Sequence, residues 1–254
     1  MIAADLHAKR ALVTGGASGI GLATVEVLAR NGAAVAINDL AGNPNLAAEV
    51  ARLKSEGLNV IAAPGDVGDA LDAGRMVEAA AASLGGLDYL VNNAATPGTS
   101  TPIPPADFEA TSEAFWQKLL SINLIGPFRC TKAAAPHLKA ARGAIVNTAS
   151  ISAFGGGGSS SVYCATKAGL VALTREWARA LGPEVRVNAV APGLVEGSNW
   201  DCKWTPEYYA RYAAELPLRR AGRPADYAET ILFLCAGAGY MTGQTLVVDG
   251  GMGA

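Results

Sequence analysis

The chain has 254 residues, 50% of them hydrophobic and 17% charged, which suits one large domain with a buried core and leaves little room for a second. A formal net charge of −2 and the lack of a long basic run argue against nucleic acid or an anionic membrane as the main partner. No apolar run reaches the length of a membrane span, and Met1–Asp5 lacks the regions of a signal peptide, so we expect a cytoplasmic protein.

The first predicted unit is a strand, a glycine-rich turn and a helix, at Ala11–Val13, Thr14–Gly21 and Leu22–Arg30. Gly15, Gly19 and Gly21 have the spacing G-x-x-x-G-x-G, in which absent side chains permit a tight turn and let backbone N–H groups approach a pyrophosphate. A P-loop is excluded, because Leu22 stands where that motif needs Lys. The pattern favours a dinucleotide site, although glycine-rich turns after strands are common in α/β proteins.

Asp39 follows the second predicted strand, about 20 residues beyond the glycine turn. A carboxylate at this position accepts hydrogen bonds from the hydroxyls of the adenosine ribose and repels a 2′-phosphate. Leu40 after it, and Ala17 and Ser18 in the turn, offer no cation to that phosphate. We therefore predict NAD rather than NADP as the cofactor, the alternative being a solvated Asp at a strand end.

Apolar strand candidates alternate with helical stretches along the whole chain. The candidates are Ala11–Val13, Ala34–Ile37, Val60–Ala63, Tyr89–Val91, Ala144–Asn147, Val185–Val190 and Thr245–Val248. Such alternation favours a parallel, doubly wound sheet, in which ligands bind at the carboxyl ends of the strands. The motifs named here mostly follow strand ends, so the sequence predicts that they meet in one crevice.

Tyr163 and Lys167 are four residues apart, and Ser150 precedes the tyrosine by thirteen residues. If this segment is helical, the spacing places the phenol and the ammonium on one face, where the cation favours the phenolate. A phenol tuned in this way exchanges a proton with an alcohol near neutral pH. Tyr and Lys also occur at this spacing by chance, so the pair indicates a catalytic site only together with the other motifs of the chain.

Together these motifs resemble the short-chain dehydrogenase/reductase family, in its compact single-domain branch, over nearly the whole chain. The matching segments run in the family's order: Thr14–Gly21, Asp66–Val67, Asn92–Ala95, Asn123, Ser150, Tyr163 with Lys167, Pro192–Gly193 and Asp249–Gly251. The resemblance implies a single α/β, Rossmann-like domain over residues 1–254, with a doubly wound seven-stranded parallel sheet and helices on both faces. It also implies a homotetramer, and hydride transfer between NAD and a secondary alcohol or ketone.

The resemblance assigns catalysis to Asn123, Ser150, Tyr163 and Lys167. Tyr163 is the expected general acid/base, with its pKa lowered by Lys167 and by the nicotinamide, and Ser150 is expected to bind the substrate oxygen. Asn123 is expected on a long helix, as part of a water relay to Lys167. Pro127, four residues later, cannot donate to the carbonyl of Asn123 and leaves it free for water, although a simple helix kink is the alternative.

The resemblance also assigns the cofactor contacts. They are Gly15, Ser18, Gly19, Ile20, Gly21, Asp39, Asp66, Val67, Asn93, Tyr163, Lys167 and Val195. Asp66 and Val67 are expected beside the adenine, Asn93 beside the adenosine ribose and Val195 beside the carboxamide. Family members commonly place Thr two residues after the position of Val195, whereas this chain has Gly197 and then Ser198, so that contact is either replaced by Ser198 or missing.

Residues 196–216 are expected to form a lid over the substrate. Five aromatic residues fall in this segment: Trp200, Trp204, Tyr208, Tyr209 and Tyr212. The four-residue spacing of Trp204, Tyr208 and Tyr212 places them on one helical face, which either packs on the core or forms an apolar lid. Asp201 and Lys203 either bind a polar substrate group or face water. A bulky or aromatic substrate is the expectation.

Other classes of protein are weighed against this prediction. A non-catalytic NAD-binding sensor or assembly subunit is disfavoured by the intact set of Asn123, Ser150, Tyr163 and Lys167. A hydrolase is disfavoured because no G-x-S-x-G elbow surrounds a serine. We predict no metal site, because the four cysteines lack C-x-x-C spacing and the two histidines are isolated. A sugar epimerase of the longer related branch would need a further substrate domain.

Overall fold

Seven apolar segments of the chain form one parallel sheet. The computed structural model describes residues 4–155, 157–197 and 205–253, and the side chains of Pro206 and Tyr208 are left out. The strands are β1 Arg10–Val13, β2 Ala34–Asp39, β3 Val60–Pro64, β4 Tyr89–Asn92, β5 Ala144–Thr148, β6 Arg186–Pro192 and β7 Thr245–Val248. Their order in the sheet is β3-β2-β1-β4-β5-β6-β7, and every neighbouring pair is parallel. All seven predicted strands are confirmed.

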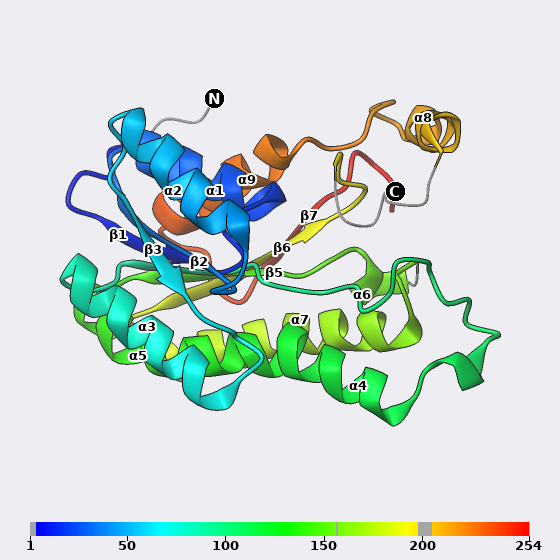
Figure 1. Ribbon diagram of the computed structural model, residues 1–254, viewed down its shortest axis with the longest axis horizontal. Helices are drawn as coiled ribbons and strands as arrows, with labels where there is room; N and C mark the ends of the chain where they lie inside the picture. The colour runs from blue at the N-terminus through cyan, green and yellow to red at the C-terminus, as the bar shows by residue number, and fades with distance from the viewer. Residues whose placement is uncertain (1–3, 156, 198–204, 254) are drawn as a thin grey trace.

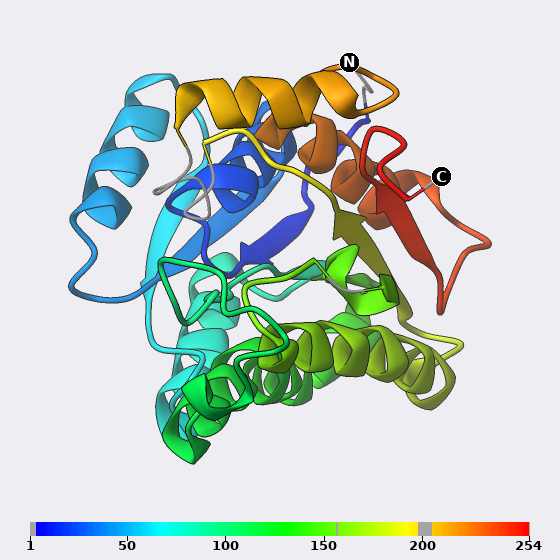
Figure 2. The same ribbon diagram turned by 90° about the vertical axis from the view of Figure 1, so that its right-hand side faces the viewer.

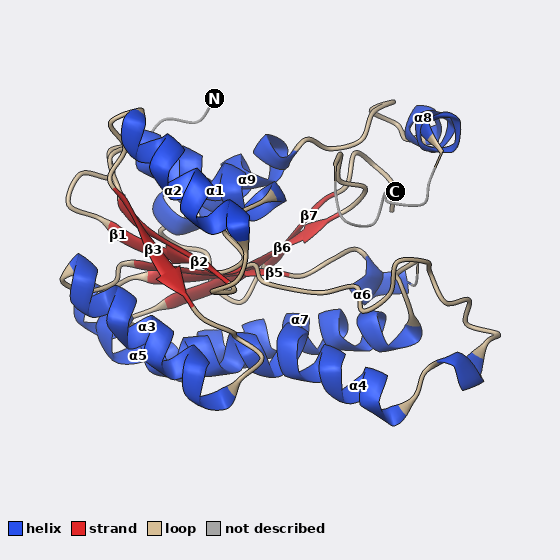
Figure 3. Ribbon diagram, viewed as in Figure 1, coloured by secondary structure: helices blue, strands red, loops and turns tan. Residues whose placement is uncertain are grey.

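Helices cover both faces of this sheet (Figures 1 and 3). They are α1 Gly19–Arg30, α2 Pro44–Ser55, α3 Ala70–Leu84, α4 Glu113–Leu120, α5 Gly126–Ala141, α6 Ser152–Gly155, α7 Ser161–Leu181, α8 Pro206–Glu215 and α9 Pro224–Leu232. A short 3-10 helix at Phe108–Ala110 precedes α4, and π-helical turns lie at Ser121–Ile125 and Phe233–Gly237. α1, α2 and α9 lie on one face, and α3, α5 and α7 on the other. Among the described residues, no helix has the length and apolar character needed to cross a membrane.

The strands are apolar on both sides because both faces of the sheet are covered. In β1, Ala11 and Val13 pack into the layer under α1 and α9, whereas Leu12 points to the opposite layer with α3 and α5. All three side chains are fully buried. This arrangement explains why continuous apolar runs, rather than alternating ones, marked the strands in the sequence.

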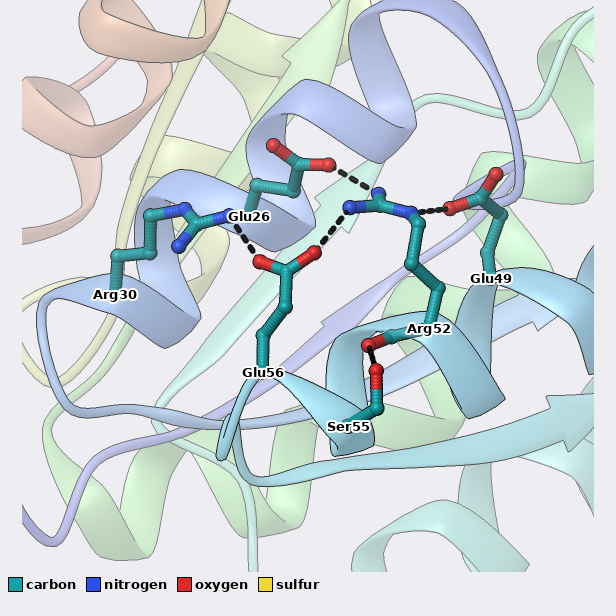
Figure 4. Close-up of polar contacts among 6 residues, drawn as sticks. All are labelled: Glu26, Arg30, Glu49, Arg52, Ser55 and Glu56. Carbon is teal, nitrogen blue, oxygen red and sulfur yellow. Dashed lines mark hydrogen bonds and ion pairs between the residues drawn. The ribbon is translucent and has the colours of Figure 1, made fainter.

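Ion pairs between charged side chains connect α2 to α1 (Figure 4). Arg52 of α2 pairs with Glu26 of α1, and its guanidinium also donates to Glu49 and Glu56, each at 2.7 Å. Arg30 of α1 pairs with Glu56 at 2.5 Å. The loop after β2 leads directly into α2, so this network helps to fix the helix that follows Asp39.

Candidate active site

One cavity of about 890 Å³ opens at the carboxyl ends of the strands. β1 lies between β2 and β4, so the chain order reverses there, and ligands of such sheets bind beside this reversal. Of the residues predicted to bind or react, the cavity wall contains Gly15, Ser18, Gly19, Ile20, Asp39, Asp66, Val67, Asn93, Ser150, Tyr163, Lys167 and Val195. Segments that are distant in the sequence therefore meet as expected (Figure 2).

The glycine turn fits the pyrophosphate of a dinucleotide. Gly19 begins α1 with a φ of +52°, and a Cβ built there would meet nothing within 4 Å, so the helix N-terminus is open to the cavity. Gly21 is not in the cavity wall, and its expected contact with the cofactor stays a prediction. A Cβ on Gly21 would lie 2.0 Å from the carbonyl oxygen of Gly15, so only a glycine here allows the turn to close this tightly.

The adenosine end of the cavity is built by the loops after β2, β3 and β4. Asp39 is half-buried at the end of β2, with Oδ1 accepting from Leu40 N at 2.9 Å. The Oδ1 of Asp66 accepts from Gly68 N at 2.7 Å, which fixes the turn that contains Val67. Nδ2 of Asn93 donates to the carbonyl of Gly15 at 3.1 Å, so Asn93 also holds the glycine turn in place.

Tyr163 and Lys167 lie on the first two turns of α7, and Ser150 lies just after β5. α7 begins at Ser161 because Oγ of Ser160 accepts from Tyr163 N at 3.1 Å. The side chain of Ser150 hydrogen-bonds to that of Tyr163. Nζ of Lys167 lies 5.6 Å from the centroid of the Tyr163 ring and donates to the carbonyl of Thr148 at 2.7 Å. The three predicted side chains therefore form one group, in which Tyr163 and Lys167 are buried and Ser150 is half-buried.

Ser152 was missed by the sequence analysis. Oγ of Ser150 donates to Oγ of Ser152 at 3.1 Å, and Ser152 N donates to Oγ of Ser150 at the same distance. Ser152 is buried and lines the cavity. Its hydroxyl and amide thus orient the hydroxyl of Ser150. The signal was present as two serines at i and i+2, a spacing at which a serine hydroxyl commonly bonds to nearby backbone.

Burial has the largest effect on the pKa values of this group. Burial raises the pKa of Tyr163, and the hydrogen bond from Ser150 offsets this shift only in part. Burial also lowers the pKa of Lys167 from 10.5 to about 8, since both groups lose contact with water. Around the phenol, the effect of burial is therefore larger than that of the hydrogen bond from Ser150.

Asn123 lies outside the cavity wall and is fully buried. Instead of a continuous long helix, it occupies the π-helical turn Ser121–Ile125 between α4 and α5. Pro127 has no N–H for the carbonyl of Asn123, and the wider turn accommodates this loss. Oδ1 of Asn123 accepts from Thr96 N at 2.8 Å, and Nδ2 donates to the carbonyl of Thr96 at 2.9 Å and to Thr166 at 3.4 Å. Asn123 therefore connects the loop after β4 to α7, beside Lys167.

The expected lid lies partly outside the described residues, which exclude Ser198, Trp200, Asp201, Lys203 and Trp204. Tyr212 of α8 lines the cavity and packs with Tyr209 against an apolar group that includes Leu194. The hydroxyl of Tyr212 lies 3.9 Å from Sδ of Met252, which also lines the cavity. Tyr212 thus packs on the core and also lines the cavity, so the two alternatives considered for this residue both apply. Within the described ranges, no group of three His, Cys, Asp or Glu side chains could hold a metal ion.

Comparisons with known proteins agree with this geometry. Residues 15–253 match the family described as Enoyl-(Acyl carrier protein) reductase. The chain is 41% identical to cis-4-hydroxycyclohexanecarboxylate dehydrogenase of Sinomonas cyclohexanicum, over 95% of each chain. It is 35% identical to the 3-oxoacyl-acyl-carrier-protein reductase of Staphylococcus aureus, over 96% of this chain and 98% of that one. A blue fluorescent protein from a metagenomic library, solved with NADPH, superposes with a TM-score of 0.87 at 32% identity, over 99% of this chain and 100% of the other.

Proposed function

The chain belongs to the short-chain dehydrogenase/reductase family of oxidoreductases, and we propose that it interconverts a secondary alcohol and a ketone with NAD as cofactor. The observation that carries this proposal is the shared cavity. Its wall holds the glycine turn and Asp39 at one end, and Ser150, Tyr163 and Lys167 at the other. A bound dinucleotide would supply or accept the hydride, and its oxidised nicotinamide would bring a positive charge toward the phenol.

Tyr163 is proposed as the general acid/base. In reduction, its hydroxyl protonates the ketone oxygen, and in alcohol oxidation the phenolate takes the proton back. Ser150, whose Oγ accepts from Ser152 N, turns its single hydroxyl proton from Oγ of Ser152 to the same oxygen and stabilises the charge that develops there. Lys167, held by the carbonyl of Thr148, places an ammonium near the phenol ring.

The relatives support this reaction class. One is named as a dehydrogenase of a hydroxycyclohexane compound and another as a reductase of a 3-oxoacyl group, and both names describe the alcohol–ketone pair. A non-catalytic NAD-binding subunit is the alternative. An NAD-coupled absorbance screen over secondary alcohols, acyl derivatives and polyols separates the two, since a sensor would bind NAD and turn over none of them.

We propose further that residues 196–216 close over the substrate, that the protein forms a homotetramer, and that it acts in the cytoplasm. Tyr212 supports the first proposal, because it lines the cavity from α8. The edge strand β7 supports the proposed homotetramer. It is partly exposed, with Val247 52% exposed, and so offers apolar surface to another subunit. Light scattering in solution would test the subunit number.

Ketone reduction is expected to slow as the pH rises through about 8. Lys167 has a lowered pKa of about 8, so its ammonium is present below that pH and is lost above it. Without the cation, the phenolate left after proton donation is less stable. The value of kcat/KM for reduction should therefore be flat on the acid side and decline on the alkaline side. Lys167→Arg keeps the positive charge, so a decline at the same pH in this variant would count against Lys167 as its origin.

Pro127→Ala is expected to slow proton exchange more than cofactor binding. The substitution supplies an N–H that bonds to the carbonyl of Asn123, and this carbonyl is then lost to the proposed water relay. The alkaline limb of the pH–rate profile should shift, and the NAD dissociation constant should change little. Identical pH–rate profiles in the two proteins would instead identify Pro127 as the cause of a simple kink.

A further inference from the structure

The segment that follows β6, residues 192–197, lies entirely in the cavity wall. Within it, Val195 forms a parallel bridge with Gly222, which lies in the segment before α9. In this bridge Gly222 N donates to the carbonyl of Leu194 at 2.9 Å, and Glu196 N donates to the carbonyl of Gly222 at 2.8 Å. The bridge does not use the N–H and C=O of Val195 itself. Val195 therefore keeps one backbone donor and one backbone acceptor at the cavity wall.

The hydroxyl of Tyr227, a residue of α9, holds the same segment at the carbonyl of Leu194. It donates to this carbonyl at 2.9 Å, so the oxygen accepts two hydrogen bonds, one from Gly222 N and one from Tyr227. Tyr227 is 1% exposed and is not in the cavity wall, so its hydroxyl acts on the backbone and not on a ligand. Both lone pairs of the Leu194 oxygen are then used.

This bond also orients Val195. The C=O of Leu194 and the N–H of Val195 belong to one planar peptide unit, in which the two groups point in opposite directions. Fixing the oxygen toward Tyr227 and Gly222 therefore fixes the N–H of Val195 in the opposite direction. A tyrosine outside the cavity thus determines how a backbone donor inside its wall is presented.

Gly222 leaves the space that the Tyr227 hydroxyl occupies. A Cβ at Gly222 would lie 2.2 Å from Oη and 2.6 Å from Cζ of Tyr227. Contacts this short do not occur between real atoms, so a side chain at position 222 would displace the phenol. The glycine and the tyrosine therefore form one arrangement around the carbonyl of Leu194.

Tyr227 itself is held by the packing of α9. Asp226, its neighbour in the chain, accepts from the guanidinium of Arg220 at 2.6 Å, which joins the segment that contains Gly222 to the start of α9. The apolar side chains of α9 pack in the same layer as those of α1 (Figure 1). α1 begins at the glycine turn, so Tyr227 connects residues 192–197 to the helix whose N-terminus opens to the cavity.

We propose that Tyr227 is a positioning residue for the nicotinamide end of the cofactor, because its hydroxyl fixes the peptide that carries the N–H of Val195. The inference rests on the proposed function, which places the carboxamide of NAD beside the backbone of Val195. A primary carboxamide has an acceptor oxygen and a donor NH2, and so matches the N–H and C=O of a single residue. Without the hydroxyl, the peptide between Leu194 and Val195 is held by Gly222 alone, and the nicotinamide is bound less well.

The test compares NADH with ADP-ribose, which has the same adenosine and pyrophosphate but no nicotinamide. In Tyr227→Phe, calorimetric titration should show a Kd for NADH that is raised about fivefold, the effect of one hydrogen bond. The Kd for ADP-ribose should stay within about twofold of the native value, because the adenosine end of the cavity is built by other loops. An unchanged ratio of the two Kd values would overturn the proposal. Equal affinity of the native protein for the two ligands would also overturn it, since the nicotinamide would then gain nothing from the wall.

The matched control is Tyr89→Phe. Tyr89 is also buried, but it begins β4, at the opposite end of that strand from the cavity, and is not in the cavity wall. The change removes a buried tyrosine hydroxyl in the same way, so the ratio of the Kd values for NADH and ADP-ribose should stay at its native value. An equal shift of this ratio in both variants would show a general loosening of the fold and would refute a specific role for Tyr227.

The titrations do not depend on turnover, so the two proposals fail separately. A shifted ratio in Tyr227→Phe, in a protein that turns over no alcohol or ketone, would uphold the positioning role and refute the alcohol–ketone reaction. Turnover of a ketone together with an unchanged ratio would uphold the reaction and refute the role of Tyr227.

Discussion

Tyr163→Phe is expected to lower kcat about a thousandfold while NAD binding stays within a few-fold of the native value. The change removes the hydroxyl that donates the proton, and general acid–base catalysis contributes about 10²–10⁴-fold to such rates. The ring itself remains, so the packing of Tyr163 against Val162 and Leu119 is preserved. Steady-state kinetics with the best substrate from the screen measures the first effect, and calorimetric titration with NAD measures the second.

The matched control is Tyr240→Phe. Tyr240 is fully exposed and lies outside the cavity wall, so the same loss of a hydroxyl there should leave kcat unchanged. A Tyr163→Phe enzyme that retains a substantial part of its kcat would show that the proton comes from another group. Loss of NAD binding in the same variant would show instead that Tyr163 acts through the cofactor site, and calorimetry separates this outcome from a loss of chemistry alone.

The central strands β1, β2, β4, β5 and β6 could be predicted from the sequence because each is buried on both faces and reads as an apolar run. The edge strands β3 and β7 are only partly buried, but they also read as apolar runs. β7 was predicted over Thr245–Val248 and is found there. The order of the strands depends on which distant segments pair, and the apolar pattern alone does not encode it. The turn at Ser121–Ile125 illustrates another limit, since Pro127 shows that a bond is lost but not that the helix widens into a π turn.

The site residues were predictable where a short motif follows a strand. Gly15, Asp39 and Ser150 each follow a strand end and line one cavity. Ser152 was not predicted, because its spacing to Ser150 shows that the two can bond but not that the folded chain places both in the cavity wall. The pKa of Tyr163 also depends on the folded chain, since the spacing to Lys167 shows proximity but not the loss of water that raises the pKa.

Asp39 is expected to make the enzyme prefer NAD over NADP by about a hundredfold in kcat/KM. The half-buried carboxylate lies in the cavity wall at the end of β2, where it can accept hydrogen bonds from ribose hydroxyls. Two unit charges about 4 Å apart near a protein surface interact by a few kcal/mol, and each 1.4 kcal/mol is a factor of ten. A 2′-phosphate therefore meets enough repulsion to produce this preference.

Two substitutions test the origin of that preference. Asp39→Ser should raise kcat/KM for NADP and lower it for NAD, because the repulsion and the ribose hydrogen bonds are lost together. Lys118→Met is the matched variant, since Lys118 is a cation in the same wall, on α4 rather than at the end of β2, that the sequence analysis did not weigh. If Asp39 sets the preference, Lys118→Met leaves the ratio of the two cofactors unchanged. The opposite outcome is a native enzyme that prefers NADP and loses that preference in Lys118→Met. This result would show that the ammonium of Lys118 binds the 2′-phosphate, and that this cation, rather than the carboxylate of Asp39, selects the cofactor.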